Sequence, residues 1–280
     1  MGNPILGQVR NILSWLGDSI TEKGKARAPS RRHEQEQICF YPCPVLYCSP
    51  LGMPQSREGD MTNPRTADRM TEVLMGPDGA LHHLSRRDAD IANALSQYGP
   101  PPDRTMPQGF TTLIRTIIGQ QISRHAATSV WQKMIAAGLE HPQPIYEAGV
   151  EALKHHGLSK QKAEYIHGIA SAVACGDLDF DHLATLPGDE VSMALTRLRG
   201  VGDWTADNYR LFALLDMDAW PYNDLALQEG MKILKSLNDR PNAKIMQDMA
   251  ELWRPWRGAG ALMLWHIYAH HRRDASPASI

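Results

Sequence analysis

The sequence predicts an all-α fold, and three observations support this prediction. After residue 70, apolar residues recur at helical spacing almost throughout the chain. No alternating run of β-branched residues reaches the length of a strand, which excludes a Rossmann fold and a β-sandwich. The joints between the periodic segments carry Gly, Pro, Asp or Asn, which are the residues that end and begin helices.

The predicted helices follow one another from residue 89 onward. The segment 89–98 ends at the breaker Gly99-Pro100-Pro101-Pro102. An apolar stripe at helical steps comes next, formed by Phe110, Leu113, Ile114, Ile117, Ile118 and Ile122. The same spacing predicts helices over residues 125–137, 145–156, 160–175, 190–197, 205–215, 225–237, 244–253 and 260–271.

Composition narrows the class of protein further. The chain has 280 residues, of which 42% are hydrophobic, so it can bury a sizeable core. Lys and Arg number 29 against 31 Asp and Glu, so net charge does not make the chain a general binder of nucleic acid. No apolar run reaches the roughly 18 residues that a bilayer span needs. Any site for a polyanion must therefore be local.

Residues 1–70 differ from the rest and are predicted to be an extension. Residues 26–69 are rich in Pro, Ser, Arg, Glu and Gln, which is typical of disorder; Met61, Met70 and Met75 leave open that part of the extension is a start-site artefact. Three of the four cysteines lie here at spacings that do not match a zinc site. We expect no disulfides and a cytoplasmic location, nucleoid-associated in a bacterium and nuclear in a eukaryote.

One segment, Leu198 to Ala206, has the pattern of a helix-hairpin-helix turn. A helix ends before Gly200, Gly202 follows one residue later, and a new helix starts at once. Glycines leave backbone N–H groups bare, so a phosphate can approach the hairpin and the positive end of the second helix. An ordinary glycine-capped corner between helices would give the same Gly-Val-Gly pattern. Arg199 beside the hairpin is the best candidate for an additional phosphate contact.

Asp224 lies twenty residues after Trp204, at the start of the next apolar-periodic helix. An aspartate there is a good N-cap, and such a carboxylate can also face a cleft. From about residue 109 to 271 the chain resembles the helix-hairpin-helix DNA glycosylase superfamily, and within it the DNA-3-methyladenine glycosylase II group. The resemblance rests on separated motifs in order: 110–123 with Gly119-Gln120-Gln121, the hairpin 198–206, Asp224, and 253–257 with Leu264-Trp265-His266.

The resemblance implies a role for each of these residues. Asp224 matches the catalytic aspartate, whose carboxylate stabilises a sugar with oxocarbenium character. Gln120 and Gln121 occupy the turn that fills the gap left by a flipped base, with Gln121 the better candidate, although a helix-capping amide would explain either. The phosphate-binding hairpin comprises Arg199, Gly200, Val201, Gly202 and Thr205. Superfamily members that also cut the strand carry lysine where this chain has Trp204, so the resemblance implies a monofunctional enzyme.

Trp204 and Trp265 are the expected walls of the base pocket, and Tyr222 is a weaker third candidate. An indole face attracts a cationic alkylated base more strongly than a neutral one, although tryptophans at helical spacing are also common in cores. The chain departs from the family at Asn208, where the best-known bacterial member has an aromatic residue, and it lacks that member's β-rich domain. No Cys follows Cys175, so the four-cysteine iron–sulfur loop is absent and neither cofactor nor metal is implied.

We therefore expect a two-lobed helical core over residues 71–275, followed by a tail at 276–280. One lobe spans about 109–205, and the other spans 71–108 and 206–275. The expected function is excision of alkylated purines from double-stranded DNA by a monomeric enzyme, leaving an abasic site. Two alternatives stay open. One is a glycosylase for deaminated or oxidised bases, and the other is a non-catalytic helix-hairpin-helix module that binds DNA.

Overall fold

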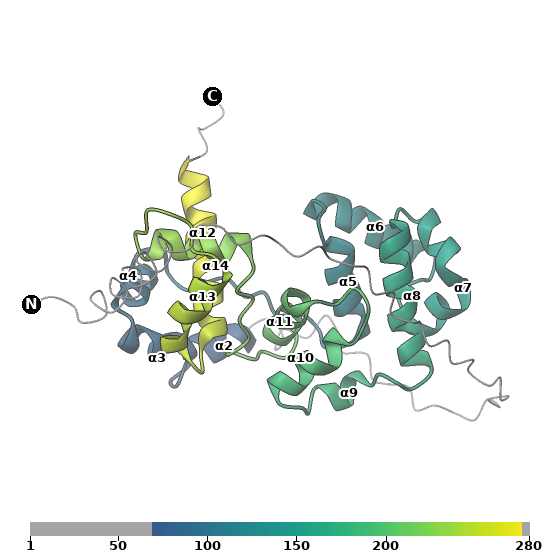
Figure 1. The fold of residues 1–280 in the computed structure, drawn as a ribbon, viewed down its shortest axis with the longest axis horizontal. Helices are drawn as coiled ribbons and strands as arrows, with labels where there is room; N and C mark the ends of the chain where they lie inside the picture. Colours follow the sequence, from purple (N-terminus) through teal and green to yellow (C-terminus); the bar gives the residue numbers. More distant parts are fainter. Residues whose placement is uncertain (1–68, 276–280) are drawn as a thin grey trace, which may run out of the picture. The chain divides into compact units, whose positions relative to one another are not determined.

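The protein is all-helical over residues 69–275, the part of the chain that the computed structural model describes (Figure 1). No strand occurs in this part, which confirms the predicted all-α class. The helices are α2 (Arg69–Met75), α3 (Ala80–Arg87), α4 (Ala89–Tyr98), α5 (Phe110–Gly119), α6 (Arg124–Ala136), α7 (Pro142–His155), α8 (Lys160–Ala174), α9 (Phe180–Leu183), α10 (Gly188–Thr196), α11 (Asp203–Phe212), α12 (Leu225–Leu234), α13 (Ala243–Ala250), η1 (Glu251–Trp253) and α14 (Arg257–Ala275).

Every helix that the apolar spacing predicts is present, and three further short helices occur. These are α2, α3 and α9, which are too short for a periodic pattern to stand out. Helix α5 ends at Gly119, before the predicted stripe does, because Gln120 leaves the helical conformation with ψ of 129° and Gln121 then adopts a left-handed backbone with φ of 56°. The helical backbone of α7 is broken at Gly149, where φ is 76°. Most of the predicted extension, and the tail from 276, lie outside the described residues.

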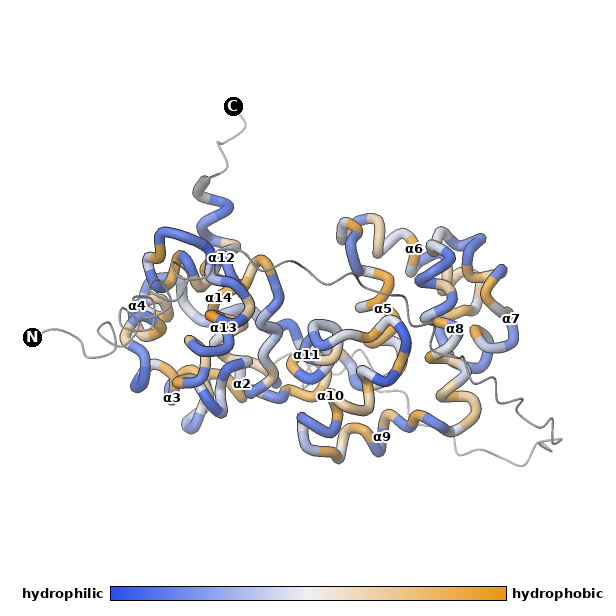
Figure 2. The backbone as a smooth tube through the Cα atoms, in the orientation of Figure 1, coloured by the Kyte–Doolittle hydropathy of each residue, from blue (hydrophilic) through white to orange (hydrophobic). Residues whose placement is uncertain are grey.

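Two hydrophobic clusters hold the described helices together. One contains buried residues of α2–α4, α12–α14 and the segment before α12, and the other contains buried residues of α5–α10. Helix α11 contributes to both, with Tyr209 in the second cluster and Leu211 in the first. Figure 2 shows hydrophobic and hydrophilic residues interleaved along the helices, as expected of helices that bury one face.

The close approach of α12 to α14 depends on Gly230. A Cβ added at Gly230 would lie 2.5 Å from the carbonyl oxygen of Leu264 on α14. A larger residue would therefore force the two helices apart. Because Asp224 precedes α12 and Trp265 follows Leu264, this packing brings these two predicted site residues together.

The predicted hairpin joins α10 to α11 as a tight turn. Val201 donates a backbone hydrogen bond to the carbonyl of Leu198 at 3.1 Å, and α11 begins at Asp203 with Gly202 as its N-cap. Gly200 has φ of 91°, a conformation that residues with a Cβ rarely adopt. A Cβ at Gly200 would also lie only 2.1 Å from the ring of Tyr165 on α8. The first glycine of the motif is thus required by the fold itself.

We predict that Gly200→Ala lowers the free energy of unfolding by at least about 2 kcal/mol, from backbone strain together with the clash against Tyr165. Gly202→Ala is the matched control, because Gly202 has φ of −98° and its added Cβ would meet nothing within 4 Å. Urea unfolding of the two variants without DNA measures the difference. Equal losses would contradict this assignment of Gly200.

Candidate active site

The carboxylate of Asp224 accepts hydrogen bonds from three helices at once. Asp224 is the N-cap of α12, and its Oδ1 accepts the backbone N–H of Leu227 at 2.9 Å. The same oxygen accepts Nε1–H of Trp265 on α14 at 3.1 Å. Its Oδ2 accepts Nε1–H of Trp204 on α11 at 2.8 Å. The structure therefore brings three of the predicted site residues into direct contact.

Both tryptophans are half-buried, so neither belongs wholly to the core. Trp265 stacks on Phe212 with ring centroids 5.6 Å apart, which fixes its orientation from the side of α11. Trp204 lies in the first turn of α11, directly after the hairpin. The hairpin and the carboxylate are consequently linked through a single side chain.

Tyr222, two residues before Asp224 in the sequence, contacts the first residue of α11. Its hydroxyl donates to Oδ2 of Asp203 at 3.3 Å, and its carbonyl accepts Nε2–H of Gln228 at 3.3 Å. Burial, followed by the charge of Asp203, raises the pKa of Tyr222. The sequence did not single out Asp203 as a partner of Tyr222, because the two residues are nineteen positions apart.

The two glutamines of the turn after α5 have different surroundings. Gln120 points its amide at the hairpin, donating from Nε2 to the carbonyl of Gly200 at 3.2 Å and to Oγ1 of Thr205 at 3.0 Å. Gln121 is exposed on its left-handed backbone. Of the two, only Gln121 has an exposed side chain.

The hairpin exposes backbone more than side chains. Val201 and Thr205 are buried, whereas Gly202 is exposed. Arg199 is also exposed; it lies 3.9 Å from Glu164, and its guanidinium lies 5.8 Å from the ring centre of Tyr165. Because the first N–H groups of a helix have no partner within it, the N-terminus of α11 offers donors at this point.

Asn208 is the position where the sequence departs from the family pattern. Its side chain is buried and donates from Nδ2 to the carbonyl of Trp204 at 2.6 Å. Asn208 therefore braces the first turn of α11 from within and supports the backbone of Trp204.

A buried ionic network follows on the same helix. Arg210 donates from Nε and Nη2 to Oδ2 of Asp216 at 2.9 and 2.7 Å, and from Nη1 to Ser192 at 2.9 Å and to Asp207 at 3.3 Å. Burial raises the pKa of Asp207 to about 6, against the opposing effect of Arg210. Sequence reasoning missed this network; Asp207 and Arg210 share α11, but Ser192 and Asp216 lie outside that helix.

Lys162 on α8 is another residue that the sequence analysis did not identify. Its Nζ donates to the carbonyls of Ile118 and Gln120 at 2.7 and 2.6 Å. The sequence did hold a signal: Lys162 lies in the first turn of its helix, where the helix dipole disfavours a cation.

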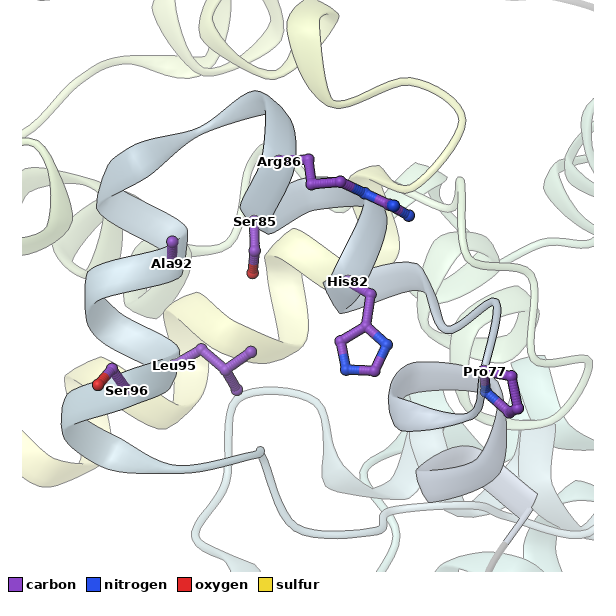
Figure 3. A pocket seen from close by; sticks show the side chains of 7 residues that line it. All are labelled: Pro77, His82, Ser85, Arg86, Ala92, Leu95 and Ser96. Carbon is purple, nitrogen blue, oxygen red and sulfur yellow. The ribbon is translucent and has the colours of Figure 1, made fainter.

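Two of the hollows in the described residues bear on the site. One, of 380 Å³, lies at the hairpin; Gln121, Lys162, Gly200 and Gly202 line it, whereas Asp224, Trp204 and Trp265 do not. The other, of 520 Å³, lies between α3 and α4, where Figure 3 shows the side chains of His82, Ser85 and Leu95. None of the predicted site residues lines this second hollow, so we leave it outside the site.

Residues 69–275 hold neither a cluster of metal ligands nor a helix that could span a bilayer. No group of three or more His, Cys, Asp or Glu side chains there could hold a metal ion. No described helix combines the length and apolar character of a bilayer span.

Comparison with known families identifies the class. The family described as HhH-GPD superfamily base excision DNA repair protein matches residues 114–255, just over half of the chain. The protein belongs to this superfamily. The matched range contains the hairpin and Asp224, together with the segment 118–122.

Individual relatives narrow the resemblance to one group. The alkylbase DNA glycosidase-like protein mag2 of Schizosaccharomyces pombe is 27% identical over 199 residues, covering 68% of this chain and 93% of the relative. The crystal structure of DNA-3-methyladenine glycosidase from Bacillus halodurans matches with a TM-score of 0.64 at 28% identity, covering 70% of this chain and 91% of the other. The S. pombe 3-methyladenine DNA glycosylase Mag1, in complex with abasic DNA, matches with a TM-score of 0.60 at 27% identity, covering 66% and 94%.

We predict that Asp207 makes the protein less stable as the pH rises from 4 to 7. The pKa of Asp207 is about 6 in the folded protein, above its ordinary value of 3.8, so folding favours the protonated carboxyl. The stability that this group contributes is complete below about pH 3.8 and is lost as the pH rises through about 6. The loss is on the order of 2 to 3 kcal/mol.

Asp207→Asn should remove this contribution, because an amide does not titrate. Urea unfolding of both proteins at intervals from pH 4 to 7 gives the difference in unfolding free energy. We expect wild type to lose stability relative to the variant over this range. Parallel profiles would contradict the raised pKa.

Proposed function

We propose that this protein is a monofunctional DNA glycosylase that excises alkylated purines, of the 3-methyladenine and 7-methylguanine type, and leaves an abasic site. The observation that carries the proposal is the carboxylate of Asp224, which two indole N–H groups hold beside the hairpin. The relatives named as 3-methyladenine glycosylases support the substrate class.

The hydrogen bonds of Asp224 leave one acceptor position for chemistry. A carboxylate has about four such positions. Two donors reach Oδ1, and one reaches Oδ2. The remaining position on Oδ2 is thus the one that can face the sugar or an attacking water. Because the three donors come from different helices, the carboxylate is preorganised for charge that develops in the transition state.

The proposed reaction is hydrolysis of the N-glycosidic bond. The bond between C1′ and the base nitrogen breaks, and the base leaves with both electrons. A base alkylated on a ring nitrogen is cationic and departs neutral, so it needs no proton from the enzyme. Oδ2 of Asp224 stabilises the positive sugar and accepts the proton of the water whose oxygen bonds to C1′.

The surroundings of Asp224 favour a cationic base over a neutral one. Two half-buried tryptophans, Trp204 and Trp265, bond to the carboxylate through their indole N–H groups, and a cation over an indole face is attracted by the ring. Asp203, bonded to the hydroxyl of Tyr222, adds a second acidic group at the start of α11. An undamaged base is neutral, so it gains neither the cation–π attraction to the indoles nor the attraction to the charge of Asp203.

The strand is left uncut in this proposal because no amine occupies the position after the hairpin. Trp204 is there, and an indole nitrogen that donates to Asp224 cannot form a Schiff base with the sugar. In this proposal the N-terminus of α11 binds a phosphate of the duplex, and exposed Gln121 fills the gap in the base stack.

We predict that Asp224→Asn lowers the rate of base release by at least about a hundredfold, because an amide cannot stabilise the positive sugar. Asparagine is also a good N-cap, so the start of α12 survives. The assay uses duplex DNA containing 3-methyladenine or 7-methylguanine, with strand breaks scored before and after alkali. Asp179→Asn is the matched control, since Asp179 caps α9 in the same way.

The outcomes separate the candidate functions. Release that depends on Asp224, with breaks appearing only after alkali, supports the proposal. The same assay is run on duplexes that contain a deaminated or an oxidised base; Asp224-dependent release from these alone would keep the role of Asp224 and overturn the substrate. Lesion-independent binding without any release would indicate a DNA-binding module.

A further inference from the structure

The turn that carries Gln121 is held by an unusual donor. Helix α5 ends at Gly119, and the last carbonyls of a helix have no partner within it. Nζ of Lys162 donates to two carbonyls here, those of Ile118 and Gln120. A cation at the C-terminal end of a helix is also favoured by the helix dipole. Lys162 therefore closes α5 and holds the next residue at the same time.

This ammonium group has no carboxylate partner among the ion pairs of the described residues. Its neighbour Lys160 differs: it pairs with Glu164 at 3.9 Å, and its side chain is 75% exposed. Lys162 is half-buried, and burial lowers its pKa. Burying part of a cation costs desolvation free energy, and the two hydrogen bonds to carbonyls offset this cost.

The conformation of the turn explains why it needs such support. Gln121 has φ of 56°, and a non-glycine residue rarely adopts this backbone without surrounding constraints. Lys162 fixes the carbonyl of Gln120 immediately before it. The bonds from the side chain of Gln120 to Gly200 and Thr205 extend the connection to the hairpin. Lys162 thus links α8 to the turn, and Gln120 links the turn to the hairpin.

We propose that Lys162 is a positioning residue that acts through Gln121, holding the turn in the conformation from which Gln121 engages a DNA duplex. The proposal rests on the proposed function, in which Gln121 fills the gap left by a flipped base. Lys162 itself touches neither the base nor the sugar.

The test measures insertion rather than base release. Full-length Asp224→Asn protein is bound to duplex DNA holding a tetrahydrofuran abasic analogue opposite 2-aminopurine, whose fluorescence reports changes in stacking at the gap. We expect Lys162→Met to reduce both the fluorescence change and the affinity at least about threefold. Lys160→Met, in the same turn of α8, should leave both unchanged. Lys162→Arg, which keeps a cationic donor, should recover part of the loss.

A double-mutant cycle distinguishes positioning from general destabilisation. If Lys162 acts through Gln121, then Lys162→Met should cause no further loss in a protein that already carries Gln121→Ala. The proposal would be overturned if the losses of affinity from the two substitutions multiply in the double mutant. It would also be overturned if Lys162→Met leaves affinity and fluorescence unchanged, as Lys160→Met does. Urea unfolding checks that each variant is folded, and Lys162→Gln replaces Lys162→Met if the latter is not.

The two proposals can fail separately. The fluorescence readout uses a protein whose Asp224 is already replaced, so it does not depend on base release. A wild-type protein that releases no base, combined with a positive cycle, would overturn the proposed function and keep the role of Lys162. Base release by the wild-type protein, combined with losses that multiply in the double mutant, would support the proposed function and overturn the role of Lys162.

Discussion

The carboxylate of Asp224 is the point on which the site depends, because it joins α11, α12 and α14 through three N–H donors. Trp204 follows the hairpin directly, so any phosphate bound at the hairpin lies at a fixed distance from the carboxylate. Trp265, on α14, packs against the hydrophobic cluster that contains residues of α2–α4 and α12–α14. In the proposed chemistry, the contacts that bind the DNA at the hairpin therefore also set the position of the carboxylate.

One buried and one half-buried ion pair hold this arrangement on both sides. Lys235, directly after α12, donates to both oxygens of Asp88 at 2.7 Å, and Trp253 donates to the same carboxylate at 2.8 Å. Arg257, at the start of α14, is bidentate to Asp218 in the segment before Asp224. Such pairs add little net stability, but losing one partner would leave a buried charge uncompensated. Their contribution is to fix the ends of α12 and α14.

The sequence predicts the helices, the hairpin and the position of Asp224 at a helix start, because these depend on local spacing and capping. It does not predict where side chains point. Trp204 and Trp265 were expected as stacking walls, and the structure adds that both indole N–H groups bond to Asp224. Thr205 and Gln120 turn toward each other, a contact between residues 85 positions apart. Lys162 was missed for the same reason, since its partners are 42 and 44 residues away.

The most direct test of this account is an amide and indole ¹H–¹⁵N spectrum of the free protein, which contains seven tryptophans. Comparing wild type with Asp224→Asn should move the indole signals of Trp204 and Trp265 most, because these two N–H groups bond to the replaced carboxylate. The indole of Trp253, bonded to Asp88, should stay in place. Unmoved signals for Trp204 and Trp265 would contradict the geometry on which the proposed chemistry rests.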